Sequence, residues 1–576
     1  MASGILGTAV SGLMAFQRSI ETTSNNIANV NREGYSRQRV ESAANLPERT
    51  GGGYIGTGVK VTNIARSYDQ FITGQLRSSS SAFGEVDAFK SFATQVDSLL
   101  ADPSTGMNPA MQNFFNAVND VANDPSDIAA REVMLIEGDS LTQRFDLTSA
   151  RFEALRNQVN SDVSAMTQTI NTYTENLAGL NKKISADIGR ANGQQQPNDL
   201  LDERDRVLKQ LAELVDIAVV PQANGMDTVI LSNGQPLVID GQSFQLGVQS
   251  NEFDPTKLEI VLKPKAGDPQ VISGQIKGGR LAGTLRFRDE ILDPAQQKVG
   301  AVAAAIAIDF NSIHAAGYDL DGNGSPGQDF FKFTGVAEVP VMALTTNTGT
   351  ANLTAAFDVT STNIDTSDYL LTYDGTYTLT RMSDDSVISL TASAGPAPIT
   401  LTATAPDVLP GITLELSATP AVNDQFFIRP TFQAAKDIAM NITDPRQIAA
   451  ATNVETDPVT GVVSIFAGAM PGDNRNALSL AALANSSNMF GGTASFQEAF
   501  GQVVSKVGGA THAANVSASA QESLLNSATA ARETIAGVNL DEEAANLVKF
   551  QQSYQAAAQA ISTASALFDS LIGAVR

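Results

Sequence analysis

The sequence contains no cysteine and only two histidines. Without cysteine the chain has no disulfide, no thiol nucleophile and no thiolate metal site. The histidines, His314 and His512, lie in separate helical segments far apart in sequence, so neither has the local motif that supports a metal site or a catalytic triad. We therefore expect no catalytic residue, no metal and no cofactor, and hence not an enzyme.

Basic residues and long hydrophobic runs are also scarce. Lys and Arg number 37 against 61 Asp and Glu, which gives a net charge of -24. Binding to nucleic acid needs clustered basic surface, which this composition does not favour. The most apolar run, residues 301–308, is too short to span a bilayer. We expect neither nucleic acid nor a membrane as a partner.

The first residues do not have the pattern of a cleaved signal peptide. No Lys or Arg precedes Arg18, and the apolar residues are spaced rather than continuous. We expect that export, if it occurs, uses no cleaved N-terminal signal.

The last forty residues, 537–576, show an apolar seam that advances by four and three residues in alternation. This spacing predicts a long helix that lays one face against another helix. The seam positions are Leu540, Ala544, Leu547, Gln551, Tyr554, Ala558, Ile561, Ser565, Phe568, Ile572 and Val575.

The first thirty residues carry a matching seam, in which several positions are small or polar. Isolated helices are marginal in water, so the two ends are expected to pair with each other or to become ordered in an assembly. The predicted assembly interface consists of Leu6, Leu13, Phe16, Ile20, Ile27, Leu540, Leu547, Tyr554, Ile561, Phe568 and Ile572.

Between the ends the chain alternates helical and β-rich stretches. A helical stripe runs through residues 126–190, and two hairpins are predicted with turns at Asn233-Gly234 and Asp374-Gly375. At 576 residues, three or four domains are expected. The predicted fold class is α+β multidomain: a terminal α-helical coiled coil, a long-helix bundle domain and inserted β-rich domains. The predicted boundaries are 1–40 with 536–576 for the coiled coil, 41–216 with 286–316 and 431–535 for the mainly helical domain, 217–285 for a small β-rich domain, and 317–430 for an inserted β-rich outer domain.

Three local patterns imitate functional motifs. Gly51, Gly53 and Gly56 match a dinucleotide-binding spacing, but a strand rather than a helix is expected after them. Residues 319–324 resemble the start of a calcium loop, but Phe330 stands where the bidentate Glu is needed. We interpret both stretches as turns. The acidic run at 199–205 is interpreted as first-turn charge with helix-surface pairs to Arg204 and Arg206 rather than as a catalytic site.

A family resemblance rests on motifs near both ends. Asn25 to Asn31, followed by Gly34-Tyr35-Ser36-Arg37-Gln38, resembles the N-terminal motif of the bacterial flagellar axial proteins, which include rod, hook and hook-associated subunits. Residues 537–547 and 550–555 resemble the C-terminal motif of the junction-forming, hook-associated members. The residues assigned to the N-terminal family motif are Asn29, Gly34, Tyr35, Ser36, Arg37 and Gln38.

The resemblance implies a structural subunit of the junction between hook and filament, assembled through its terminal helices. It further implies self-assembly, contacts with the hook protein and a second junction protein, a flagellar export chaperone for the C-terminal part, and an extracellular location on the flagellum. Two alternatives stay open at this stage. One is a hook or rod subunit, and the other is a secreted enzyme or adhesin acting through the β-rich insert.

Overall fold

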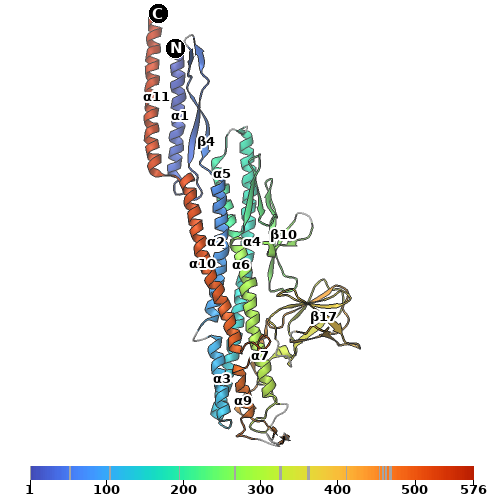
Figure 1. Ribbon diagram of the computed structural model, residues 1–576. Helices are drawn as coiled ribbons and strands as arrows, with labels where there is room; N and C mark the ends of the chain where they lie inside the picture. Colours follow the sequence, from blue (N-terminus) through green and yellow to red (C-terminus); the bar gives the residue numbers. More distant parts are fainter. Residues whose placement is uncertain are drawn as a thin grey trace.

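The computed structural model describes residues 2–50, 53–102, 106–191, 193, 195–264, 267–322, 327–359, 364–409, 411–452, 454–456, 460, 463–465 and 470–575. The molecule is elongated, with both chain ends at one tip, a bundle of long helices along its length and β-rich parts on one side (Figure 1).

The two terminal helices pack against each other, as the matching seams predict. α1 (Ala2–Ala28) and α11 (Leu540–Val575) lie side by side and antiparallel, with one of the most extensive contacts between any two elements of the described chain (Figure 1). A two-stranded sheet of β1 (Gln38–Ala44) and β4 (Val59–Arg66) lies beside α1, and β2 (Glu48–Thr50) pairs with β3 (Gly53–Ile55). These elements together are called the terminal coiled coil below.

The buried face of α11 differs from the predicted seam by one residue in every heptad. Ala544, Gln551, Ala558 and Ser565 are exposed, whereas their predecessors are packed: Glu543 and Ala564 are buried and Phe550 and Ala557 half-buried. In the other half of the predicted seam, Leu547, Tyr554 and Ile561 are half-buried, whereas Leu540 and Phe568 at its two ends are exposed. The sequence pattern missed this face because it counts apolar residues, and the first position of the true face is a glutamate.

Long helices form the body of the molecule. α2 (Gln70–Leu100) packs on α10 (Phe496–Ala536) and on α6 (Gly279–Phe287), while α3 (Met107–Asn123) packs on α4 and on α9 (Arg475–Ala482). α4 (Ile128–Arg190) is continuous over 63 residues, about 95 Å at 1.5 Å per residue. Its buried positions include Phe145, Phe152, Val159, Ile170 and Leu177, so the predicted stripe is confirmed. The bundle also contains α5 (Asn198–Leu214), α7 (Asp293–His314), which a π-helical turn (Arg288–Leu292) joins to α6, and short α8 (Ala434–Asp437).

An aromatic cluster and a neutral histidine fix the far end of the bundle. The rings of Phe114, Phe310, Phe330 and Phe331 lie with centroids 4.8 to 5.8 Å apart. His314 is fully buried against them; its Nδ1 lies 2.7 Å from the carbonyl oxygen of Gln328, and its Nε2 accepts a 3.0 Å hydrogen bond from the amide of Ala449. Burial lowers the pKa of His314 to about 4. Both ring nitrogens are engaged by backbone, so this histidine packs the core and is not placed to bind a metal.

Two β-rich parts project from the bundle. The first contains a four-stranded sheet of β5 (Ile217–Pro221), β6 (Asp227–Leu231), β7 (Pro236–Ile239) and β8 (Gln242–Ser243), and a three-stranded sheet of β9 (Gln245–Ser250), β10 (Leu258–Lys263) and β11 (Gln270–Val271). These sheets pack on α4. The hairpin predicted at Asn233-Gly234 is the β6–β7 connection.

The second β-rich part, residues 339–430, is called the outer β-rich part. It is one antiparallel eight-stranded sheet in the order β13-β20-β15-β16-β17-β18-β19-β14, and a bridge between Val339 and Ala355 brings its two edges together. Its strands are β13 (Val341–Ala343), β14 (Leu353–Phe357), β15 (Tyr369–Tyr373), β16 (Tyr377–Arg381), β17 (Val387–Ala392), β18 (Ile399–Ala403), β19 (Ile412–Leu416) and β20 (Asp424–Ile428). The second predicted hairpin, at Asp374-Gly375, joins β15 to β16.

Some local features differ from the sequence interpretation. Helix α6 begins at Gly279, inside the range 217–285 assigned to a small β-rich domain. Few of the described residues between 431 and 474 are helical: besides α8 and a 3-10 turn (Pro445–Gln447), this stretch contains β21 (Ala439–Met440), paired with β12 (Phe331–Lys332), and the pair β22 (Val454–Thr456) and β23 (Val463–Ile465). The sequence assigned 431–535 to helix as a block because α9 and α10 dominate its second half.

Neither imitated motif has the structure of a binding site where it is described. Gly53 begins strand β3 and Gly56 lies between β3 and β4, so a strand and not a helix follows the dinucleotide-like spacing, while Gly51 lies outside the described residues. In the calcium-like loop Asp319 accepts a hydrogen bond from the amide of Asp321, and Asp321 pairs with Arg446. Asn323 and Gly324 lie outside the described residues.

Candidate functional site

The N-terminal family motif lies where the terminal coiled coil meets the bundle. Residues 29–38 run from the end of α1 past α5 and the end of α10 before entering β1. We call the polar network at this point the joint. It consists of Asn26, Tyr35, Ser36, Arg37, Gln38, Arg66, Asp202, Asp205, Arg532 and Glu543.

Asn26 is the centre of the joint on the coiled-coil side. Its side-chain oxygen accepts hydrogen bonds from the Tyr35 hydroxyl at 2.8 Å and from the Gln38 amide at 3.0 Å. Its side-chain nitrogen donates to the Gln38 carbonyl at 2.9 Å and to the Glu543 carboxylate at 3.0 Å. Asn26 is 1% exposed, so all of its polar capacity is satisfied by protein groups that are far apart in sequence.

Arg37 connects the motif to the last residue of α10 and to the first turn of α11. Its guanidinium donates to Glu543 at 2.7 Å and to Glu542 at 2.8 Å, and its amide donates to the carbonyl of Ala536, the last residue of α10. The carboxylates of Glu542 and Glu543 lie in the first turn of α11, where the helix dipole favours negative charge. The turn between α10 and α11 is therefore held in one conformation by Arg37, with Asn539 capping α11 through the amide of Asp541.

A second set of charges joins β4 and the motif to α5. Arg66, 8% exposed, donates to Asp202 at 3.0 Å and to Asp205 at 2.5 Å, and its guanidinium lies 4.2 Å from the ring centroid of Tyr68. Asp202 also accepts from the Ser36 amide at 2.9 Å. Burial raises the pKa of Asp202, while the Ser36 amide and the Arg66 guanidinium oppose the rise.

The acidic run of α5 is thus partly misread from sequence. Glu203 and Arg206 do form the expected helix-surface pair. Asp202 and Asp205 instead pair with Arg66, which is more than a hundred residues distant, and Arg204 pairs with Asp227 at 3.0 Å. Spacing within the helix could not reveal partners on β4 and β6.

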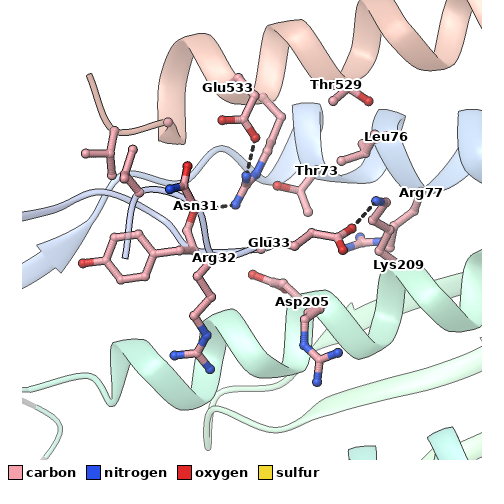
Figure 2. A pocket seen from close by; sticks show the side chains of 17 residues that line it. Asn31, Arg32, Glu33, Thr73, Leu76, Arg77, Asp205, Lys209, Thr529 and Glu533 are labelled. Carbon is pink, nitrogen blue, oxygen red and sulfur yellow. Dashed lines mark hydrogen bonds and ion pairs between the residues drawn. The ribbon is translucent and has the colours of Figure 1, made fainter. Parts of the chain in front are cut away.

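A cavity of about 270 Å³ lies beside the joint, between the motif, α2, α5 and α10 (Figure 2). Lys209 bonds to Glu33 at 2.9 Å across it, and this contact lowers the pKa of Glu33. Gly34 has a φ of +84°, a conformation that glycine adopts without strain. The Arg206 side chain packs next to it and leaves little room for a larger residue. Arg532 donates to the Tyr35 carbonyl at 2.9 Å from the α10 side.

The structure places all six predicted motif residues at or next to the joint. Asn29 bonds back to Asn25 at the end of α1, Gly34 lies beside the cavity, and Tyr35, Ser36, Arg37 and Gln38 belong to the network. Burial raises the pKa of the Tyr35 hydroxyl, and the nearby Asp199, Asp202 and Glu543 add to that effect.

The predicted interface residues of the terminal helices fall into two groups. Leu13, Phe16, Ile20, Ile27, Leu547, Tyr554 and Ile561 are half-buried between α1, α11 and the adjoining strands. Leu6, Leu540, Phe568 and Ile572 are 39%, 50%, 51% and 44% exposed, respectively. The second group presents apolar surface to solvent in the isolated chain.

Sequence reasoning missed Asn26, Arg66, Asp202, Arg532 and Glu543 as members of a site. Two of them, Asn26 and Glu543, lie within the stretches that resemble family motifs, and this resemblance was the available signal. Their convergence is a property of the fold.

Two absences apply to the residues that the structure describes. No group of three or more His, Asp or Glu side chains there is arranged to hold a metal ion. No helix there has the length and hydropathy needed to cross a membrane.

The terminal segments match flagellar axial proteins. A family model of the flagella basal body rod protein matches residues 6–35, and a model of the flagellar basal body rod FlgEFG protein C-terminal matches residues 534–574. These are the segments that form the terminal coiled coil and part of the joint, so the chain is an axial structural protein of the bacterial flagellum.

The middle of the chain matches one group within the flagellar axial proteins, the hook-associated proteins. Models of the flagellar hook-associated protein FlgK helical domain and of the flagellar hook-associated protein 1 D2-like domain match residues 93–331 and 342–430. The chain is 33% identical to flagellar hook-associated protein 1 of Salmonella typhimurium over 575 residues and 32% identical to that of Escherichia coli over 572, with 99% of each chain covered. The structure of the flagellar hook junction protein FlgK from Burkholderia pseudomallei aligns with a TM-score of 0.69 at 28% identity, covering 80% of this chain and all of that one.

The chain belongs to the flagellar hook-associated protein 1 family, the structural proteins of the hook–filament junction. The agreement over nearly the whole length separates it from rod and hook subunits, with which it shares its terminal segments.

Proposed function

We propose that the chain joins the junction through its terminal coiled coil, and that the joint sets the direction in which the bundle leaves it. The predicted interface residues Leu6, Leu540, Phe568 and Ile572 carry the proposal, because they are large, apolar and exposed in the isolated chain. Leu6 lies on α1 and the other three on α11, and large apolar side chains left exposed on a helix pair mark a surface that another protein covers.

The end of α11 supports this assignment. α11 has 36 residues and α1 has 27, and the contact of Asn26 with Glu543 places Phe568 about level with the first residues of α1. Ile572 therefore lies beyond the shorter helix. No charged residue occurs between Lys549 and Asp569, so this stretch meets a partner without desolvating charge.

The proposed partners are other copies of this chain, the hook protein and the second hook–filament junction protein, with a flagellar export chaperone before assembly. The proposed location is extracellular, after export without a cleaved signal peptide. We propose no catalytic activity: the charged clusters of the joint are paired with one another, and this is a structural arrangement. The proposed division keeps the four predicted domains, with two boundaries moved: β1 to β4 belong to the terminal coiled coil with α1 and α11, and α6 belongs to the helical domain rather than to the small β-rich domain.

Site-specific photo-crosslinking in flagella tests the interface. A photoreactive phenylalanine analogue at Phe568 is expected to crosslink to another copy of this chain or to a neighbouring axial protein, because Phe568 is 51% exposed on the helix proposed to be covered. The matched control carries the same analogue at Ala394, which is exposed on the outer β-rich part.

Mass spectrometry of flagella sheared from irradiated cells identifies the crosslinked chains. Efficient crosslinking from position 394 with none from position 568 would contradict the proposal, since both variants would then be in the structure while α11 remained uncovered.

A further inference from the structure

The outer β-rich part meets the rest of the molecule at a buried ionic cluster centred on Arg429. Arg429 directly follows β20 and is 3% exposed. Its guanidinium donates to Asp254 at 2.5 Å and to Asp368 at 3.1 Å, and it lies 3.5 Å from the ring centroid of Phe432. Asp368 belongs to the outer part, and Asp254 lies in the loop between β9 and β10 of the first β-rich part. One arginine thus connects three regions of the chain.

The bundle contributes the rest of the cluster. Arg156 of α4 pairs with Asp293 of α7 at 2.8 Å, and Gln296 accepts from Arg156 while donating to the Phe432 carbonyl. Packing accompanies these bonds: the rings of Phe253 and Phe427 lie 5.5 Å apart between the two β-rich parts.

Charge within this buried cluster is not balanced. Three carboxylates, Asp254, Asp293 and Asp368, face the two guanidiniums of Arg156 and Arg429, and the five side chains are 3 to 15% exposed. Lys257 pairs with Asp293 at 3.9 Å from the rim, where it is 23% exposed and bonds more closely to Asp289 at 2.9 Å, and buried Arg288 also pairs with Asp289. The core of the cluster therefore contains one carboxylate more than it has guanidiniums.

Asp368 is the carboxylate that is least well held. Asp254 takes the shorter bond to Arg429 and also accepts from the amide and hydroxyl of Thr256. Asp368 shares Arg429 at the longer distance of 3.1 Å, and its buried Oδ1, like that of Asp293, forms no well-aligned hydrogen bond, although the Gln297 side chain is close to Asp368. Gln297 and Arg429 favour the charged form, while Asp293 of α7 opposes it; the neighbouring Asp365 is engaged with Arg381 and the Tyr369 hydroxyl.

We propose that Asp368 binds a proton in the folded chain and that this proton strengthens the attachment of the outer β-rich part to the bundle. Protonation of the Asp368 carboxyl removes the excess negative charge, and the charge of Arg429 then compensates Asp254 alone. The ionised carboxyl leaves an uncompensated buried charge at the point where the three regions meet, and such a charge weakens the contact that buries it.

The sign of the pH dependence follows from the same geometry. Burial raises the pKa of Asp368 to about 6 from an ordinary value of 3.8. A carboxyl whose pKa is higher in the attached state stabilises that state at low pH, and the stabilisation is lost as the pH rises from about 4 to about 6. Between pH 4.5 and 7 the equilibrium constant for opening of the contact is expected to increase roughly 20-fold.

Amide hydrogen exchange of the full-length chain tests the proposal. Peptides covering 364–373 and 424–432 are followed from pH 4.5 to 7.5, with rates corrected for intrinsic exchange. The wild type should show the roughly 20-fold rise and a plateau above pH 7. Asp368→Asn should abolish the rise, whereas Asp385→Asn should retain it. Asp385 is an exposed residue of the turn between β16 and β17, with φ of +55°, which asparagine tolerates.

A further variant keeps the test decisive if Asp368→Asn fails to fold. Asp254→Asn leaves Arg429 to Asp368, so the rise should become smaller and shift to lower pH. Opening that is independent of pH in the wild type, a rise that persists in Asp368→Asn, or an unchanged rise in Asp254→Asn would each overturn the proposal.

Discussion

Removing residues 540–576 is expected to abolish incorporation into the flagellum while leaving the bundle and both β-rich parts folded. α11 packs chiefly on α1 and the joint, whereas the large buried clusters belong to α2 to α10 and the sheets. The loss is expected to be complete, because α1 without α11 keeps only β1 and β4 as packing partners, and a helix with so little packing is marginal in water. Circular dichroism and thermal unfolding of the purified truncation would report the folded body.

Incorporation is measured by immunoblotting flagella sheared from cells that express only the variant. Because the truncation also removes a segment proposed to bind the export chaperone, the matched variant is Ile561→Asp, which keeps α11 but places a charge on its half-buried face. Both should be absent from sheared flagella. Truncated chain present there at wild-type amounts would show that α11 is not needed for assembly.

Glu543→Ala is expected to destabilise the pairing of the terminal helices by about 2 kcal/mol, the cost of leaving a buried polar group without its partner. The Glu543 side chain is 2% exposed, and its removal leaves the side-chain nitrogen of Asn26 without this acceptor, while Arg37, which is 28% exposed, keeps Glu542. A loss of this size corresponds to roughly thirtyfold faster exchange of α1 and α11 amides.

Glu542 provides the control for this prediction. It pairs with the same arginine at 2.8 Å, but its side chain is 58% exposed, so Glu542→Ala should cost less than about 1 kcal/mol. Hydrogen exchange of the two variants at one pH compares them directly. Equal effects would mean that burial of Glu543 does not organise the joint.

Periodicity in the sequence was sufficient for the elements that have one apolar face. The terminal helices and the stripe of α4 repeat their apolar residues every three or four positions, and both form as predicted. The two hairpins were found from Asn-Gly and Asp-Gly turns, whose positive φ at glycine is observed at Gly234 and Gly375.

The features that could not be predicted from the sequence depend on contacts between residues that are far apart along the chain. The buried face of α11 was displaced because Glu543 is stabilised by Arg37 and Asn26, more than five hundred residues earlier. For the same reason the pairing of Arg66 with Asp202 and of Arg204 with Asp227 was beyond a local charge pattern. The motif residues were found through family resemblance, and their physical role as a joint came from the structure.

The most direct test of a junction role is electron microscopy of cells that lack this chain, with flagellin assayed in the medium. We expect hooks without filaments and flagellin lost to the medium, because filament subunits would be exported with no junction on which to build. Filaments of normal length on normal hooks would contradict the junction role, and loss of the hook itself would indicate a rod or hook subunit instead.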